Sequence, residues 1–329
     1  MATAAAANTR RVGAPLSVIT ASRADTDGVG TPQRRGWTRL WARIMRTALV
    51  GGMAALAILW SDPAMADPVP DSTIRYVAMG DSRAAGPYLA PISLHDGCFR
   101  SVEGYPGVMA RALHADSFSN VACSGATTEN LTTASQSTAT GAVPPQIDAL
   151  RPDTTLVTVS IGGNDIAWQS LVAPCYTTVP GTDAHCRTAP ETIGGMTSAL
   201  AALEPKVSAA LVAIEQRAPT ARVLLVGHGG IFGAHGCWPN IPTSDADAAW
   251  ISGFFVRMNQ VLTAAATATG ARFVDVATAA IGHDACAGPD QRWFEGLLPQ
   301  SFAQSLHPTT AGMRAIAARV LTISGVSPE

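Results

Sequence analysis

The sequence predicts a single α/β domain, a three-layer α/β/α sandwich with helices on both faces of a mainly parallel five-stranded sheet. Short β-branched or apolar runs alternate with longer alanine-rich stretches over residues 67–329. This alternation is typical of parallel strands joined by right-handed crossovers. With 47% hydrophobic and 14% charged residues, the 329-residue chain can bury a sizeable core, which excludes wholesale disorder.

The individual elements follow from the length and period of these runs. Apolar or β-branched runs predict strands over 74–79, 118–122, 156–161, 222–226 and 272–276. Longer stretches predict helices over 107–115, 196–217, 246–269 and 310–321. Loops are expected over 86–104, 171–195, 229–244 and 281–306, and each of them contains at least one cysteine.

Residues 1–66 are predicted to be an export leader. Arginines precede an almost uninterrupted apolar run over 48–60, which is followed by the small residues Ala64 and Ala66 around Met65. The run is shorter than the roughly 20 residues that span a bilayer. A basic flank, a short apolar stretch and an A-x-A site are typical of a signal peptide, so we expect cleavage after Ala66 and one domain over 67–329.

Two alternatives remain for this segment. Met45 could begin a compact signal peptide of its own, which would make residues 1–44 an upstream extension. A retained N-terminal anchor is the other alternative. With cleavage after Ala66, no stable membrane span remains, and we expect a secreted, extracellular protein. The sequence leaves open whether it stays associated with the cell wall.

Charge is divided unevenly between the leader and the body. Residues 1–66 contain eight arginines and three aspartates, whereas residues 67–329 contain 14 basic and 21 acidic residues. The body is therefore acidic, and its only lysine is Lys206. No basic stripe is available for phosphate contacts, which excludes nucleic acid as a partner. We expect a monomer.

The cysteines indicate a disulfide framework. Six cysteines lie in the body, an even number in a chain predicted to be exported. Sequence alone leaves the pairing open, but a sequential pairing closes short to medium loops without entangling them: Cys98–Cys123, Cys175–Cys186 and Cys237–Cys286. The alternative is a metal site formed by His228, His235, Cys237 and His283. The sequence has no C-x-x-C pair or H-E-x-x-H motif to support it.

Three predicted strands end in residues that can carry chemistry. Ser82 follows the first strand, Gly125 the second and Asn164 the third. Carboxyl ends of parallel strands meet at one edge, where ligands bind. A serine needs a base and oxyanion donors to act as a nucleophile. A lone serine after Gly-Asp is more often a helix N-cap, and an asparagine in a Gly-Gly-Asn-Asp loop more often forms a turn.

His307 is the most suggestive base among the seven histidines. It stands just before the last predicted helix, and Pro308 suits the first helical position, which would fix the entry of the chain. For the remaining histidines we expect surface or structural roles.

At this point the chain resembles the GDSL or SGNH hydrolase family. The four blocks of that family occur in order: Gly80-Asp81-Ser82, Gly125, Gly163-Asn164-Asp165 and His307-Pro308. The segments around Cys98, Cys123 and Cys286 look like those of secreted, three-disulfide actinobacterial esterases and lipases of the family. The resemblance implies the SGNH hydrolase, flavodoxin-like fold. No G-x-S-x-G elbow occurs, which argues against an α/β-hydrolase.

The resemblance also implies roles for these residues. Ser82 would be the nucleophile, and His307 the general base and later the acid. The oxyanion hole would combine the backbone N–H groups of Ser82 and Gly125 with the Asn164 side chain. Asp81 and Asp165 are expected to brace loops. Neither a metal nor a cofactor is implied.

The chain departs from the family at the residue that orients the histidine. Most members have an aspartate three residues before it, and here that position is Gln304, followed by Ser305. We infer that a main-chain carbonyl near Gln304 and Ser305 orients the imidazole, giving a Ser-His dyad. The Gln304 side chain is one alternative, and a distant carboxylate, Asp284 or Asp290, is another.

The predicted function is that of a secreted carboxylic ester hydrolase, an esterase or lipase acting on small-molecule or lipid esters through an acyl-serine. Apolar loop residues support a lipid or acyl substrate, although they could equally form loop core: Phe232, Trp238, Trp293 and Phe294. A phospholipase A-type or carbohydrate-deacetylating enzyme is the alternative. An exported binding protein without catalysis is a further hypothesis, which the missing aspartate favours and the intact constellation opposes.

Overall fold

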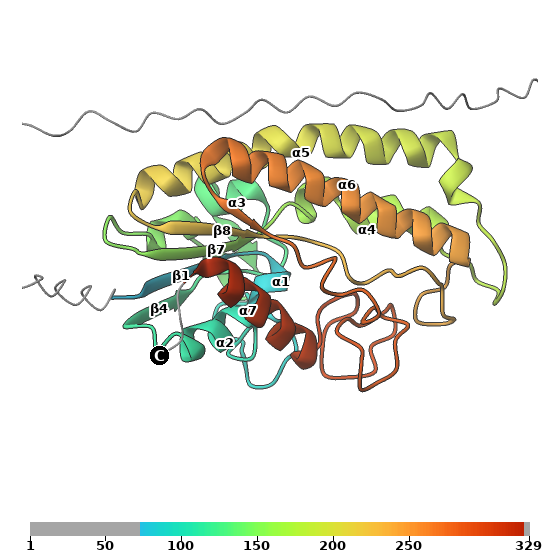
Figure 1. Cartoon of the computed structure of the whole chain (residues 1–329), viewed down its shortest axis with the longest axis horizontal. Helices are drawn as coiled ribbons and strands as arrows, with labels where there is room; N and C mark the ends of the chain where they lie inside the picture. Colours follow the sequence, from blue (N-terminus) through green and yellow to red (C-terminus); the bar gives the residue numbers. More distant parts are fainter. Residues whose placement is uncertain (1–72, 326–329) are drawn as a thin grey trace, which may run out of the picture. The chain divides into compact units, whose positions relative to one another are not determined.

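A five-stranded parallel sheet forms the centre of the domain in the computed structural model, which describes residues 73–325 (Figure 1). The strand order is β4-β1-β7-β8-β9, and every neighbouring pair is parallel. The strands are β1 Arg75–Gly80, β4 Ser117–Asn120, β7 Leu156–Ser160, β8 Arg222–Val226 and β9 Arg272–Val274. The predicted fold class is confirmed, and the predicted strand ends are correct to within two residues.

Four long helices cover the two faces of this sheet. Figure 1 shows α5 and α6 above the sheet and α2 and α7 below it. Their bounds are α2 Tyr105–Ala112, α5 Pro190–Arg217, α6 Asp245–Thr269 and α7 Thr310–Ser324. Because both faces are covered, the central strands β1 and β7 are almost entirely buried, as their mainly apolar sequences require.

Two sequence-based expectations about helix starts were wrong. Residues 171–195 were expected to be a loop, but α5 begins at Pro190, which occupies the first turn, where its missing N–H costs nothing. Pro308 was expected at the first helical position of the last helix. It precedes the N-cap Thr309 instead, whose hydroxyl accepts from the Gly312 N–H at 3.1 Å.

Several short elements were not predicted, because each is too short to show a period. The short helices are α1 Ser82–Ala85, α3 Thr128–Thr132 and α4 Trp168–Val172. Two small antiparallel sheets pair β2 Ile92–Ser93 with β3 Arg100–Ser101 and β5 Gln136–Thr138 with β6 Gly141–Val143. The 3₁₀ turns are η1 Gln146–Ala149, η2 Asn164–Ile166, η3 Ala173–Cys175 and η4 Cys186–Thr188. All of these elements lie in the connections between the main strands and helices.

Three disulfides fasten these connections. They join Cys98 to Cys123, Cys175 to Cys186 and Cys237 to Cys286, the same pairs as in the sequential arrangement. Because the Cys237 sulfur is bonded to Cys286, it is not a thiolate available to the alternative metal site.

The order of the strands determines where the site lies. The chain leaves β1 for β4 at one edge and then returns to β7 on the other side of β1. Such a reversal opens a crevice at the carboxyl ends of the two central strands. Ser82 follows β1, and Asn164 follows β7, so both flank this crevice.

The predicted leader, its cleavage after Ala66 and the alternative start at Met45 lie outside the described residues. Within residues 73–325, α5 alone is long and apolar enough to cross a membrane, judged by length and composition. It packs against α6, and Met196, Leu203 and Leu211 on it are buried in the core. A core helix passes the same test of length and composition.

Candidate active site

The turn after β1 holds Ser82 in a fixed position. At Gly80, φ is +136°, and a Cβ would lie 2.3 Å from the Ser160 carbonyl oxygen, so only glycine fits beside β7. The Gln146 side chain accepts from the Gly80 N–H at 2.7 Å and donates to its carbonyl at 2.8 Å. Asp81 then caps α1 by accepting from the Arg83 N–H at 2.9 Å. The strand therefore ends abruptly, and Ser82 is partly exposed at the start of the helix.

The loop before α7 places His307 against this serine. His307 Nε2 lies 2.6 Å from Ser82 Oγ, although 225 residues separate them. Backbone hydrogen bonds tie residues 307–309 to residues 293–295. The Glu295 N–H donates to the His307 carbonyl, and the Thr309 N–H donates to the Trp293 carbonyl. The main chain that carries the imidazole is thus fixed at His307 and two residues after it.

A main-chain carbonyl is the partner of the other ring nitrogen. His307 Nδ1 lies 2.7 Å from the Ser305 carbonyl oxygen. A carbonyl can only accept, so Nδ1 carries the proton. In a neutral imidazole Nε2 is then the acceptor, and Ser82 must donate to it.

The alternative orienting groups make no hydrogen bond to the His307 ring, whose partners are Ser305 and Ser82, and one of them, Asp290, is exposed. The Gln304 side chain lines the same cavity as His307, but no hydrogen bond joins the two side chains. Asp284 accepts from the Cys286 N–H at 2.8 Å and lines a different cavity. The geometry therefore matches the main-chain alternative, with Ser305 as the residue.

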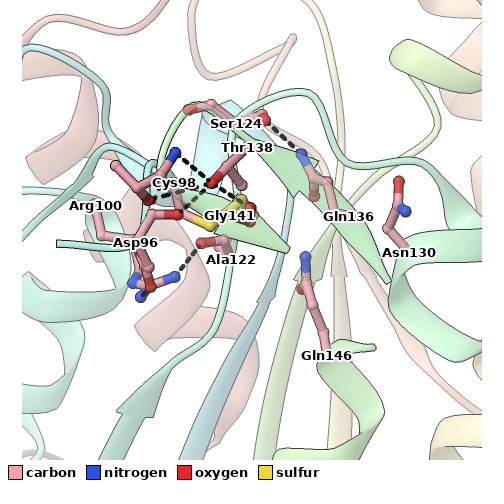
Figure 2. The surroundings of a disulfide bond; sticks show 12 residues. Asp96, Cys98, Arg100, Ala122, Ser124, Asn130, Gln136, Thr138, Gly141 and Gln146 are labelled. Carbon is pink, nitrogen blue, oxygen red and sulfur yellow. Dashed lines mark hydrogen bonds and ion pairs between the residues drawn. A yellow bond between two sulfur atoms is a disulfide. The ribbon is translucent and has the colours of Figure 1, made fainter. Parts of the chain in front are cut away.

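The loop after β4 holds Gly125 near Ser82. Figure 2 shows the Cys98–Cys123 bridge and the polar side chains around this loop. The Ser124 N–H donates to the Cys98 carbonyl, and the Gln136 amide donates to the Ser124 carbonyl at 2.7 Å. Gly125 itself has φ +85°, in the region that favours glycine.

Asn164 and Asp165 connect the loop after β7 to the segment that follows Gly125. The Asn164 amide donates to the Ala126 carbonyl at 2.9 Å. The Asp165 carboxylate accepts from the Thr128 hydroxyl at 2.6 Å and from the Thr128 N–H. Asp165 thus braces the start of α3, and Asp81 braces α1, as expected from the sequence.

One cavity of about 150 Å³ contains the predicted set. Ser82, Gly125, Asn164 and His307 all line it. A second cavity of about 520 Å³, between α6 and the loops over 229–235 and 277–284, shares Phe255 with it. A further cavity of about 610 Å³ lies at the opposite edge of the sheet, where strands begin, and contains none of these residues.

Burial of the imidazole lowers the pKa of His307 and keeps the ring neutral. Burial lowers the pKa of His307 to about 4; the hydrogen bond to Ser305 opposes this shift, and the nearby Arg83 guanidinium adds to it. Burial also raises the pKa of Asp81 to about 7, which the Arg83 N–H and guanidinium oppose. At neutral pH His307 is therefore unprotonated and able to accept a proton from Ser82.

Sequence reasoning missed three residues that shape this site. Arg83 is buried, donates to the Gly227 carbonyl at 3.4 Å and lies 5.5 Å from the centre of the Phe294 ring. His228 was expected to have a structural role; its Nε2 lies 3.0 Å from the Ile161 carbonyl, yet it also lines the cavity. Gln146 gave no sequence signal. Arg83 could have been found from the sequence, since it directly follows Ser82.

The four aromatic residues proposed from the sequence as an acyl surface are divided in the structure. Phe232 is buried and lines the larger cavity, whereas Phe294 is buried under Arg83. Trp293 stacks on His283 with ring centroids 3.9 Å apart, and Trp238 is exposed. None of the four lines the cavity that contains Ser82.

Comparisons with known proteins identify the family of this chain. The model of the GDSL-like lipase/acylhydrolase family matches residues 78–315. The chain therefore belongs to that family, a class of carboxylic ester hydrolases. Lipase 2 of Streptomyces coelicolor is 32% identical over 303 residues, covering 86% of this chain and 98% of that protein.

Two solved structures share the fold. Phospholipase A1 from Streptomyces albidoflavus has a TM-score of 0.62 and 25% identity, covering 76% of this chain and 98% of its own. An extracellular lipase from Streptomyces rimosus has a TM-score of 0.62 and 26% identity, covering 76% of this chain and 99% of its own.

Proposed function

We propose that this chain is an exported serine esterase or lipase that hydrolyses acyl or lipid esters through an acyl-serine intermediate, with Ser82 and His307 acting as a dyad. The observation that carries the proposal is the 2.6 Å contact between Ser82 Oγ and His307 Nε2, with Nδ1 held by a carbonyl. This arrangement leaves a neutral base aimed at the nucleophile.

The proposed reaction begins when Ser82 Oγ attacks the ester carbonyl carbon and His307 Nε2 takes the hydroxyl proton. The carbonyl oxygen becomes an oxyanion, for which the N–H groups of Ser82 and Gly125 and the amide of Asn164 are the proposed donors. The C–O bond to the alcohol then breaks, and His307 returns the proton to the leaving oxygen. Water, deprotonated by His307, cleaves the acyl-serine to release the acid and restore the Ser82 hydroxyl.

Export is supported by one observation on this chain and one on a solved structure with the same fold. Three disulfides lie in the described domain, and such bridges persist in oxidising compartments. A solved structure with the same fold is that of an extracellular lipase. The leader over residues 1–66, with cleavage after Ala66, would direct this export, and N-terminal sequencing of the secreted protein tests it: Asp67 is the expected first residue.

The acyl or lipid substrate is supported by the apolar cavity beside the site. Its lining is mainly glycine, alanine and apolar side chains, and Phe255 borders both cavities. The similarity to Lipase 2 supports the same substrate class. The similarity to phospholipase A1 makes hydrolysis of phospholipid esters the second candidate.

A graded substrate panel tests the proposal. Turnover of p-nitrophenyl esters of increasing acyl length is measured beside phosphatidylcholine and acetylated sugar, with Ser82→Ala as the control. We expect turnover of the p-nitrophenyl esters, lost in Ser82→Ala, and labelling of Ser82 by a fluorophosphonate. A folded protein that is neither labelled nor active would favour the non-catalytic binding protein, and activity on acetylated sugar alone would favour the deacetylase.

A further inference from the structure

The loop over residues 296–306 carries His307 at its end and an exposed apolar tip at its centre. Phe302 is 86% exposed and Leu298 is 54% exposed. No residue of this loop is charged, although 14% of the whole chain is. Five consecutive residues, 298–302, are exposed.

Hydrogen bonds brace this tip. The exposure of Phe302 is therefore not the result of a loop without contacts. The buried Glu295 carboxylate accepts from the Gln300 N–H at 2.9 Å and from the Ser301 hydroxyl at 2.7 Å. Arg292, also buried, donates to the Gln300 side-chain oxygen at 2.8 Å. A buried carboxylate and guanidinium thus fix the two residues that precede Phe302.

The base of the same loop belongs to the candidate active site. Gln304 and Leu306 line the cavity with Ser82, and the Ser305 carbonyl holds His307. Phe302 is only two residues from Gln304. A partner that covers the tip therefore lies close to the cavity.

A second exposed aromatic residue lies on the neighbouring loop. The Leu297 N–H donates to the Asn240 carbonyl at 2.7 Å, which places the turn over 237–241 beside the loop. Trp238 on this turn is 45% exposed. Both loops follow carboxyl ends of strands, on the side of the sheet where Figure 1 shows the orange-red segment before α7.

We propose that Leu298, Phe302 and Trp238 form a lipid-docking tip that inserts into the surface of a zwitterionic or neutral lipid aggregate and holds the cavity against it. The proposal rests on the proposed function, since docking serves an enzyme whose ester substrate is part of that surface. Trp, Phe and Leu side chains supply the apolar face of elements that lie in a lipid interface, and Trp adds a polar N–H suited to that boundary. Binding grows with the apolar area buried.

The charge of the domain selects the type of surface. Residues 67–329 contain 14 basic and 21 acidic residues, and the docking tip contains none. No cationic cluster at the tip attracts anionic headgroups, and the acidic body is repelled by them. Apolar insertion into uncharged surfaces is therefore the favoured mode, and anionic lipid should weaken it.

The test separates docking from catalysis. Sedimentation with phosphatidylcholine vesicles is measured in a Ser82→Ala background, so that lipid hydrolysis does not interfere, and Phe302→Ala is added to it. We expect about tenfold weaker partitioning for Phe302→Ala, with partial rescue by Phe302→Trp. Vesicles rich in phosphatidylserine should bind the parent less than phosphatidylcholine vesicles do.

Val212→Ala is the matched control, because Val212 is 41% exposed on α5, outside the loops that carry the tip. In the otherwise wild-type enzyme, Phe302→Ala should hydrolyse monomeric p-nitrophenyl butyrate within about twofold of the parent and lose about tenfold on phosphatidylcholine vesicles or a triglyceride emulsion. Equal partitioning of Phe302→Ala and Val212→Ala would overturn the proposal. A parent that turns over the soluble ester but does not bind vesicles would also overturn it. So would a Phe302→Ala variant that alters self-association of the protein, measured by its sedimentation coefficient, and leaves vesicle binding unchanged. If the wild-type enzyme does not turn over the soluble ester, that result counts instead against the proposed function.

Discussion

The carbonyl oxygen of Ser305 lies 2.7 Å from Nδ1 of His307. The residue three before this histidine is Gln304, which has no carboxylate that could take this role. The backbone provides this acceptor, so its position depends on the path of the loop and not on a side chain. A carbonyl carries only a partial charge, so it stabilises the imidazolium less than a carboxylate does. It can still fix the tautomer in which Nε2 accepts from Ser82.

This relationship predicts different effects for two neighbouring substitutions. Gln304→Ala leaves the Ser305 carbonyl in place and should keep kcat/KM on a soluble ester within about tenfold of the parent. Ser82→Ala removes the nucleophile and should lower kcat by about 10⁴-fold or more. Steady-state kinetics on p-nitrophenyl butyrate measure both, and nitrogen NMR of His307 should show a proton on Nδ1 at neutral pH. A Gln304→Ala loss as deep as that of Ser82→Ala would rule out the main-chain carbonyl as the orienting group.

The buried histidine predicts activity far into the acidic range. Burial, with help from Arg83, lowers the pKa of His307 to about 4. Because the neutral form is the base, kcat/KM should rise with pH through about 4 and be level above it. Arg83→Met removes a cation that disfavours the imidazolium, so the pKa of His307 should rise and the acid limb should move to higher pH.

Arg83→Lys is the control for this prediction, since it keeps a cation at the buried position. Its acid limb should stay closer to that of the parent than the limb of Arg83→Met does. Circular dichroism and thermal melts establish that both variants are folded. An unchanged limb in folded Arg83→Met protein would show that burial alone sets the pKa of His307.

Loss of the Asn164 amide should slow turnover without unfolding the protein. Asn164 is exposed at the cavity and makes one side-chain bond, to the Ala126 carbonyl at 2.9 Å. Removing one oxyanion donor typically costs about 10²- to 10³-fold in kcat. Asn164→Ala should show that loss with little change in KM or melting temperature. A loss in KM alone would assign Asn164 to substrate binding.

The disulfides should differ in their effect on activity. Replacing Cys98 and Cys123 by alanine opens a loop with a sequence separation of 25, worth about 3.5 kcal/mol of unfolding free energy in the chain-entropy model. It also frees the segment that carries Gly125, so we expect lower kcat at temperatures where the variant is folded. Urea unfolding and ester turnover measure the two effects.

The Cys175–Cys186 bridge provides the matched comparison. Its sequence separation of 11 predicts a smaller loss, about 2.8 kcal/mol. Neither cysteine lines the cavity with Ser82, so turnover at moderate temperature should stay close to that of the parent. Equal losses of kcat in the two double variants would mean that the Cys98–Cys123 bridge has no special link to the site.

Much of the fold could be predicted because its signals are local. The three central strands β1, β7 and β8 are largely buried, mainly apolar runs, whereas the edge strands β4 and β9 are shorter and partly exposed. The four long helices follow stretches with enough residues to show a period. Strand ends then placed Ser82, Gly125 and Asn164 at one edge, since all five strands of the central sheet are parallel. Short elements such as α1 and α4 escaped prediction because four or five residues show no period.

The sequence by itself determined the fold class, the order of the family motifs and the residues with suitable chemistry. Only the tertiary structure decided which oxygen faces His307 Nδ1, because a backbone carbonyl has the same chemistry at every residue and only its position selects it. The same holds for Arg83 and Gln146, whose burial beside the site depends on loops that meet across long stretches of chain. Local patterns encode strands and helices, whereas the electrostatics of the cavity arise from contacts between segments that no local pattern relates.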